Sequence, residues 1–134
     1  MFIVPELDIF LNELILDYFS EGDVNKGLIK SSKIGHKELV DFFITKGAYD
    51  CNWGMYGAAF GGHKELVDFF INKGANNCNF GMNGAAHGGH KELVDFFIQK
   101  GANDWGDGMR SAARYGHKEL AEFFRNKINE ENNN

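Results

Sequence analysis

Histidine is the first residue of this chain whose type and spacing suggest chemistry. His36, His63, His90 and His117 follow one another at intervals of 27 residues. Zinc needs its histidine nitrogens at about 2.0–2.1 Å, whereas equivalent residues of stacked repeats would lie about 10 Å apart, the packing distance of helices. No two of these histidines could therefore bind one ion. We predict that the chain holds no metal, and that each histidine begins a helix and bonds to neighbouring backbone.

The two cysteines could act as nucleophiles or form a disulfide. Cys51 and Cys78 occupy equivalent places one repeat apart, in the predicted loop between a Gly-Ala pair and the next helix. A spacing of about 10 Å exceeds the roughly 7 Å between Cα atoms that a disulfide allows, so we predict free thiols, which are typical of the reducing cytoplasm. A catalytic cysteine also needs a base, and no histidine has to lie beside either thiol.

Carboxylates and glycines give no stronger catalytic signal. The acids of the repeated segment stand four residues after lysines, which is the spacing of a solvated, charged helix face. They are Asp41, Asp68, Asp95 and Glu122. The Gly-Gly pairs at 61–62 and 88–89 match no phosphate-binding loop. We therefore predict that the protein is not an enzyme and uses no cofactor.

These residues are positioned by a ten-residue segment, Gly-His-Lys-Glu-Leu-Val-Asp-Phe-Phe-Ile, which occupies 35–44 and recurs at 62–71 and 89–98, with an altered copy at 116–125. A fixed period of this length is the signature of a repeat array, in which each unit is buried only by its neighbours. We predict an all-α, helical-repeat solenoid of stacked helix-turn-helix units that forms one domain over residues 1–134. The units are 25–51, 52–78, 79–105 and 106–132.

Both ends of the predicted array differ from its middle. Residues 1–24 would form an N-terminal capping helix, because their apolar residues recur at three- and four-residue steps. The last unit would be a C-terminal cap, since Ala121 and Arg125 replace apolar residues and make its outer face more polar. Ile128 replaces the glycine that ends the other units, so the last helix is expected to run on.

Each unit should contain two helices of different character. The second, His63–Lys73 in the second unit, ends at Gly74, and glycine just past a helix is the usual left-handed cap. Its Phe-Phe pair, present in every unit, is predicted to fill the core. The first, Gly54–Gly61, contains Gly57, and glycine costs about 1 kcal/mol relative to alanine within a helix. We expect this glycine to let a neighbouring backbone come close.

Composition limits the class of partner. Lysine and arginine number 14 against 19 aspartates and glutamates, a net charge of -5. Nucleic acid and anionic membrane surfaces both require a basic face, so neither is expected as a partner. No apolar run reaches the roughly 18 residues that span a bilayer, and four acids interrupt the first 20 residues, where a signal peptide would be apolar. An intracellular protein is predicted.

Residues 54–67, Gly-Met-Tyr-Gly-Ala-Ala-Phe-Gly-Gly-His-Lys-Glu-Leu-Val, followed by Phe70-Ile71 and Gly74-Ala75-Asn76, resemble the ankyrin repeat. The family pattern runs through paired alanines, Gly-His, an apolar second helix and Gly-Ala-Asn or Gly-Ala-Asp, and the resemblance covers the chain from residue 25 onward. The period is 27 residues instead of about 33, and the missing residues fall where the family has a projecting β-hairpin finger.

The chain looks like the short, fingerless ankyrin-like arrays of large DNA viruses of protists and of some protists. This resemblance implies a non-catalytic protein that binds another protein, in the cytoplasm of the cell that makes it or of a host cell.

Comparison of the units with one another indicates a surface that differs between them. The most variable positions are three and four residues apart within a unit, so they lie on one face of the first helix and stack into a strip along the array. We call this set the first-helix strip. Its members are Lys26, Ile29 and Lys33; Trp53, Tyr56 and Phe60; Phe80, Asn83 and His87; and Asp107, Arg110 and Arg114.

Aromatic side chains and arginines dominate protein-binding hot spots, and ankyrin-like proteins bind partners on the concave side formed by their first helices. We predict that a partner protein binds Trp53, Tyr56, Phe60, Phe80, Asn83, His87, Arg110, Arg114 and the bordering Tyr115. For Trp53 and Phe80 an equal alternative is that they fill the gap left by the missing finger. A monomer is favoured. The alternative is a structural homo-oligomer, in which the strip or the second-helix face pairs with a second copy.

Overall fold

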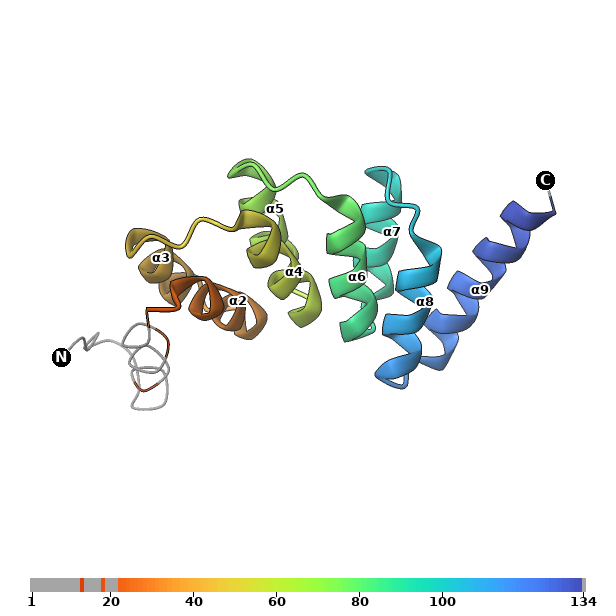
Figure 1. The fold of residues 1–134 in the computed structure, drawn as a ribbon, viewed down its shortest axis with the longest axis horizontal. Coiled ribbons are helices and arrows are strands. Elements are labelled where there is room, and N and C mark those ends of the chain that lie inside the picture. Colours follow the sequence, from red (N-terminus) through yellow and green to blue (C-terminus); the bar gives the residue numbers. More distant parts are fainter. Residues whose placement is uncertain (1–12, 14–17, 19–21, 134) are drawn as a thin grey trace.

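The structure is a computed structural model that describes residues 13, 18 and 22–133 (Figure 1). All regular secondary structure in this part of the chain is helical, which confirms the predicted all-α class. The helices are α2 (Val24–Ile34), α3 (Lys37–Thr45), α4 (Cys51–Gly61), α5 (Lys64–Asn72), α6 (Cys78–Gly88), α7 (Lys91–Gln99), α8 (Trp105–Arg114) and α9 (Lys118–Asn132). The capping helix predicted for residues 1–24 falls almost wholly outside the described residues.

The helices form consecutive pairs: α2 with α3, α4 with α5, α6 with α7, and α8 with α9. The first helices of successive pairs pack against one another in the order α2, α4, α6 and α8. Figure 1 shows the pairs side by side along the longest axis, with α2 and α9 at opposite ends. This arrangement fits a helical repeat, because each pair is covered by its neighbours in sequence.

Polar side chains that the sequence analysis overlooked set the start of every first helix. Each accepts a hydrogen bond from the backbone N–H three residues later, as an N-cap does; they are Asp23, Asp50, Asn77 and Asp104. The first helix of the second unit therefore begins at Cys51, three residues before the predicted Gly54. The prediction that Cys51 and Cys78 lie in a loop is wrong for the same reason, because they are the first residues of α4 and α6.

The second helices agree with their predicted bounds to within a residue at each end. In the second unit His63 is the N-cap and Lys73 the C-cap of α5. Gly74 follows with a φ of +113°, the left-handed conformation expected of a glycine that ends a helix.

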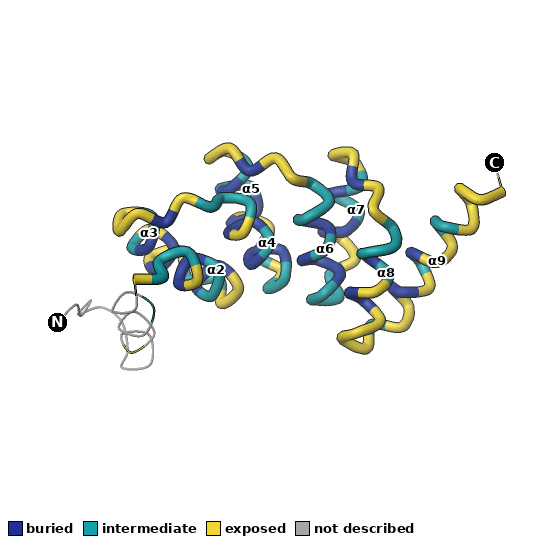
Figure 2. The backbone as a smooth tube through the Cα atoms, in the orientation of Figure 1, coloured by how far each residue is buried: buried dark blue, intermediate teal, exposed yellow. Residues whose placement is uncertain are grey.

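The core is built from one phenylalanine of each Phe-Phe pair. The second member is at most 1% exposed in every unit; these residues are Phe43, Phe70, Phe97 and Phe124. The first member is only half-buried, so the prediction that both fill the core is wrong for Phe42, Phe69, Phe96 and Phe123. Adjacent helix positions point about 100° apart, so the second phenylalanine of each pair enters the core while the first packs at its edge. Figure 2 shows buried positions recurring in each pair, with exposed ones in the turns.

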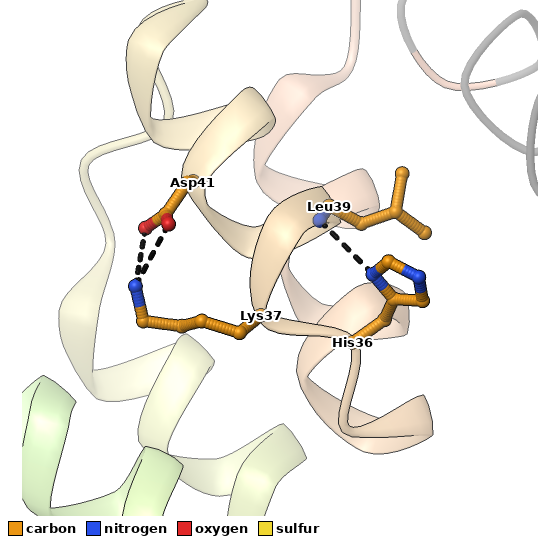
Figure 3. A network of polar contacts seen from close by, with 4 residues as sticks. All are labelled: His36, Lys37, Leu39 and Asp41. Atoms are coloured by element: carbon orange, nitrogen blue, oxygen red, sulfur yellow. Dashed lines mark hydrogen bonds and ion pairs between the residues drawn. The ribbon is translucent and has the colours of Figure 1, made fainter. Parts of the chain in front are cut away.

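Lysines cover the half-buried phenylalanines. The Nζ atom of Lys37 lies 4.2 Å from the Phe69 ring centroid in the next unit, and Lys64 lies 4.1 Å from that of Phe96. The same lysines pair with the aspartate four residues on, at 2.7 Å for Lys37 and Asp41 (Figure 3). The outer face is therefore charged, as the spacing of its lysines and acids predicted, and the partly buried rings beneath these lysines were not predicted.

The histidines connect successive units, which confirms their predicted structural role. The Nε2–H group of His63 donates to the carbonyl oxygen of Lys33 at 2.9 Å, and that of His90 to the carbonyl oxygen of Phe60 at 3.0 Å. His117 bonds in the same way to the carbonyl oxygen of His87 at 3.0 Å. His36 instead caps its own helix, where its Nδ1 atom accepts the Leu39 N–H at 3.3 Å (Figure 3).

An asparagine at the second position of a first helix holds the loop that leads to the next unit. Asn52 Oδ1 accepts the backbone N–H groups of Asn76 and Asn77, both at 3.0 Å. Asn25 and Asn79 do the same for the equivalent loops. The last unit has Gly106 at this place. There the chain does not turn but continues as α9 to Asn132, as the replacement of the terminal glycine predicted.

No helix in the described part of the chain combines the length and the apolar character needed to cross a membrane.

Candidate partner-binding surface

The row of first helices brings the nine predicted binding residues together. Trp53, Tyr56 and Phe60 lie on α4, and Phe80, Asn83 and His87 on α6. Arg110 and Arg114 lie on α8, and Tyr115 is its C-cap. Because α4, α6 and α8 pack successively, residues at the same helical position in neighbouring units become spatial neighbours.

Six rings form one continuous cluster across three units. Trp53 and Phe80 meet edge-on with their centroids 4.5 Å apart, and Tyr56 stacks on Phe80 at 4.7 Å. The cluster continues from Tyr56 to His87 at 5.6 Å and from His87 to Tyr115 at 4.8 Å. Phe60 contacts both His87 and Tyr115, at 5.5 and 5.7 Å. Edge-on and stacked pairs at these distances are favourable, so the cluster is a firm platform.

The ends of the aromatic cluster are open to solvent. Trp53 is 42% exposed and Tyr115 is 51% exposed, whereas the rings between them are half-buried. Phe80 packs between Trp53 and Tyr56, as the packing alternative for these residues requires. Trp53 contributes to the packing and to the surface at once.

A hydrogen bond between Tyr56 and His87 holds the centre of the cluster. Burial raises the pKa of Tyr56 to about 12, with a smaller contribution from Tyr115. Burial also lowers the pKa of His87, and the positive charges of Arg114 and Lys33 act in the same direction. At neutral pH the phenol therefore keeps its proton and the imidazole stays neutral, so the bond joins two uncharged groups, each of which can donate or accept.

Beside the rings the surface is polar and hollowed. A hollow of ≈ 290 Å³ is lined by Asn83, His87, Asp107, Arg110, Ser111 and Arg114. At its base the hydroxyl of Ser111, a residue only 7% exposed, donates to Asn83 Oδ1. Arg110 is paired with Asp107, while Arg114 makes no ion pair with any described residue.

Two members of this surface were not among the nine residues predicted to bind a partner. Lys33 of α2 places its Nζ atom 4.0 Å from the Phe60 ring centroid, a cation–π contact that a comparison of units does not reveal. Ser111 stands at the position that is glycine in the two preceding units, Gly57 and Gly84, and its bond to Asn83 in the neighbouring unit places it in this surface.

Within residues 13, 18 and 22–133, no group of three or more histidine, cysteine or acidic side chains gathers closely enough to hold a metal ion. Cys51 and Cys78 are free and half-buried, and the Cys51 thiol lies 3.7 Å from the carbonyl oxygen of Lys73.

Comparison with known proteins adds no family. A scan against protein-family models gave no match to this chain, and a search of curated proteins gave none either. The functional assignment therefore depends on the residues and geometry described above.

Proposed function

We propose that this protein is an ankyrin-like solenoid without catalytic activity, which binds a partner protein on a concave surface formed by its first helices. The observation that carries this proposal is the continuous aromatic cluster flanked by arginines and open to solvent at Trp53 and Tyr115. Aromatic side chains and arginines supply most of the affinity in protein interfaces. Six rings held by one another lose little conformational freedom on binding, which favours affinity.

The last helix pair supports the solenoid with a C-terminal cap. The last helix continues for 15 residues where the earlier second helices have nine. The indole N–H of Trp105 in α8 donates a hydrogen bond to Glu131 Oε1 of α9 at 2.7 Å, so the end of the array closes with polar groups. A terminal unit has no further neighbour, so its outer face must be compatible with water.

The alternative is self-association through the same surface. A two-fold interface places a patch against its own copy, so Lys33 and Arg114 would approach like charges, which is unfavourable. We therefore expect light scattering to give the monomer mass of 15.1 kDa throughout the micromolar range. A mass that rises to twice this value with concentration would favour the homo-oligomer instead.

Binding to a partner is tested by affinity capture from cell lysate with the intact chain and with a strip variant. The variant carries Phe60→Ala, His87→Ala and Arg114→Ala. These changes remove two rings of the cluster and a cation at its edge, and they leave the buried core intact. We expect a protein that is retained by the intact chain and lost by the variant.

A matched control uses three exposed second-helix positions: Asn72→Ala, Gln99→Ala and Asn126→Ala. This control should capture the same protein as the intact chain, and circular dichroism should show all three proteins folded. Equal capture by the intact chain and the strip variant would refute the proposed binding surface.

A further inference from the structure

The charge of the first-helix strip is opposite to the charge of the chain as a whole. The chain carries a net charge of -5. At the end of the strip on α8, however, Arg110 and Arg114 line the hollow with a single carboxylate, Asp107, while Lys33 of α2 covers the Phe60 ring. Both Lys33 and Arg114 act on His87, which places the two charges near the same imidazole.

Two of these cations have no partner carboxylate in the described part of the chain. Asp107 pairs with Arg110, and neither Arg114 nor Lys33 has an ion pair there, although both are exposed. Lysines of the outer face behave differently, because Lys37, Lys64 and Lys91 each pair with an aspartate four residues on. In the described part of the chain, the first-helix strip therefore carries unneutralised positive charge near His87. The lysines of the outer face are instead neutralised by aspartates of the same helix.

The polar hollow has the donors that a carboxylate needs. Arg114 offers the planar fork that binds a carboxylate through two parallel hydrogen bonds. Asn83 accepts from Ser111 through Oδ1, which leaves its amide NH2 group without a hydrogen bond among the described residues. Both groups line the hollow of ≈ 290 Å³, so one carboxylate can contact the guanidinium and the amide together.

An apolar side chain has its own place next to the hollow. Tyr115 is 51% exposed, and its ring meets the rings of His87 and Phe60. His87 lines the hollow and belongs to the aromatic cluster. A residue beside the bound carboxylate would therefore rest on Tyr115 and bury apolar surface there.

We infer that the partner presents an acidic peptide segment, in which an aspartate or glutamate binds Arg114 and Asn83 and an adjacent apolar residue packs on Tyr115. This inference rests on the proposed function and specifies the chemistry of its partner. Asp107 neutralises Arg110, so the hollow suits the single charge of a carboxylate better than a doubly charged phosphate. The acidic remainder of the chain repels polyanions such as nucleic acid.

The probe is a library of random 12-residue peptides displayed on phage and selected on the full chain. We expect the enriched peptides to share an acidic residue next to an apolar one. The most enriched peptide is then synthesised and its affinity measured by fluorescence anisotropy. Arg114→Gln should weaken its binding at least about tenfold, because a charge-assisted pair is lost, and added salt should weaken binding to the intact chain.

Arg125→Gln is the matched control. Arg125 is also an exposed arginine, but it lies on α9, where it pairs with Glu122 at 2.5 Å, so its loss should leave the affinity unchanged. Replacing the peptide's acid by its amide should be as damaging as Arg114→Gln.

The outcomes separate this inference from the proposed function. Enriched peptides without an acid, or competition by a 15-nucleotide single-stranded DNA, would overturn the acidic-segment inference. If those peptides are still lost with the triple strip variant, the proposed surface survives. Peptides that bind the strip variant as well as the intact chain, or no enrichment at all, would overturn both.

Discussion

Phe70→Ala is expected to lower the free energy of unfolding by about 3–5 kcal/mol, the usual cost of removing a fully buried phenylalanine. Phe70 is 0% exposed. Its ring fills the space over Gly54 of α4, where a Cβ atom would come within 2.4 Å of it. Alanine would leave a cavity between α4 and α5 in the place of the ring. Chemical denaturation followed by circular dichroism measures the loss.

Phe69→Ala is the control in the same pair of residues. Phe69 is half-buried beneath the Nζ atoms of Lys37 and Lys73, at 4.2 and 5.5 Å from its ring centroid. Its removal exposes a surface that water can fill, so the loss should be clearly smaller than for Phe70. Equal losses for the two variants would show that the assignment of core and outer face is wrong.

Gly57→Ala is expected to destabilise the protein, although helix propensity alone predicts a gain of about 1 kcal/mol. The added Cβ atom would lie 2.6 Å from the carbonyl oxygen of Ile29 and 3.2 Å from the Cβ atom of Ser32, both on α2. Overpacking of this kind costs on the order of 1–3 kcal/mol. Since the nearest atom belongs to the backbone, α2 and α4 would have to move apart, and the thermal midpoint should fall.

Gly106→Ala is the matched control for the direction of this change in stability. Gly106 also lies in a first helix, but the nearest atom to its added Cβ atom is a nitrogen of the Arg110 side chain at 3.7 Å, an ordinary contact. This substitution should leave stability unchanged or raise it by up to about 1 kcal/mol. A stabilising Gly57→Ala would contradict the close approach of α2 and α4.

Some close contacts between units could be predicted from the sequence. The repeat of glycine at 57 and 84 within otherwise helical segments indicated a close approach, and the structure places Ile29 O and Tyr56 O there. The histidines at 63, 90 and 117 were predicted to bond to backbone, and they do so across the unit boundary. Such residues can be recognised from the sequence because the same structural requirement recurs in every unit.

Other features needed the tertiary structure because their cause lies in a neighbouring unit. The Asn52 side chain holds a loop that begins 24 residues later, and nothing near Asn52 in the sequence marks that loop. The Tyr56 hydroxyl reaches His87 on the next helix pair, and Lys33 covers Phe60 in the same way. The contacts of Tyr56 with His87 and of Lys33 with Phe60 join side chains that vary between units, so the period of the sequence does not reveal them.

By itself the sequence determined the helical class, the repeat period and the side of the first helices on which variable residues gather. A period of 27 residues and a helical spacing of three and four are local properties that survive without coordinates. Only the tertiary structure decided which phenylalanine of each pair is buried, which rings touch and which cations have no ion pair among the described residues. Those outcomes depend on how far one helix pair is turned and shifted against the next, and packing between units sets that geometry.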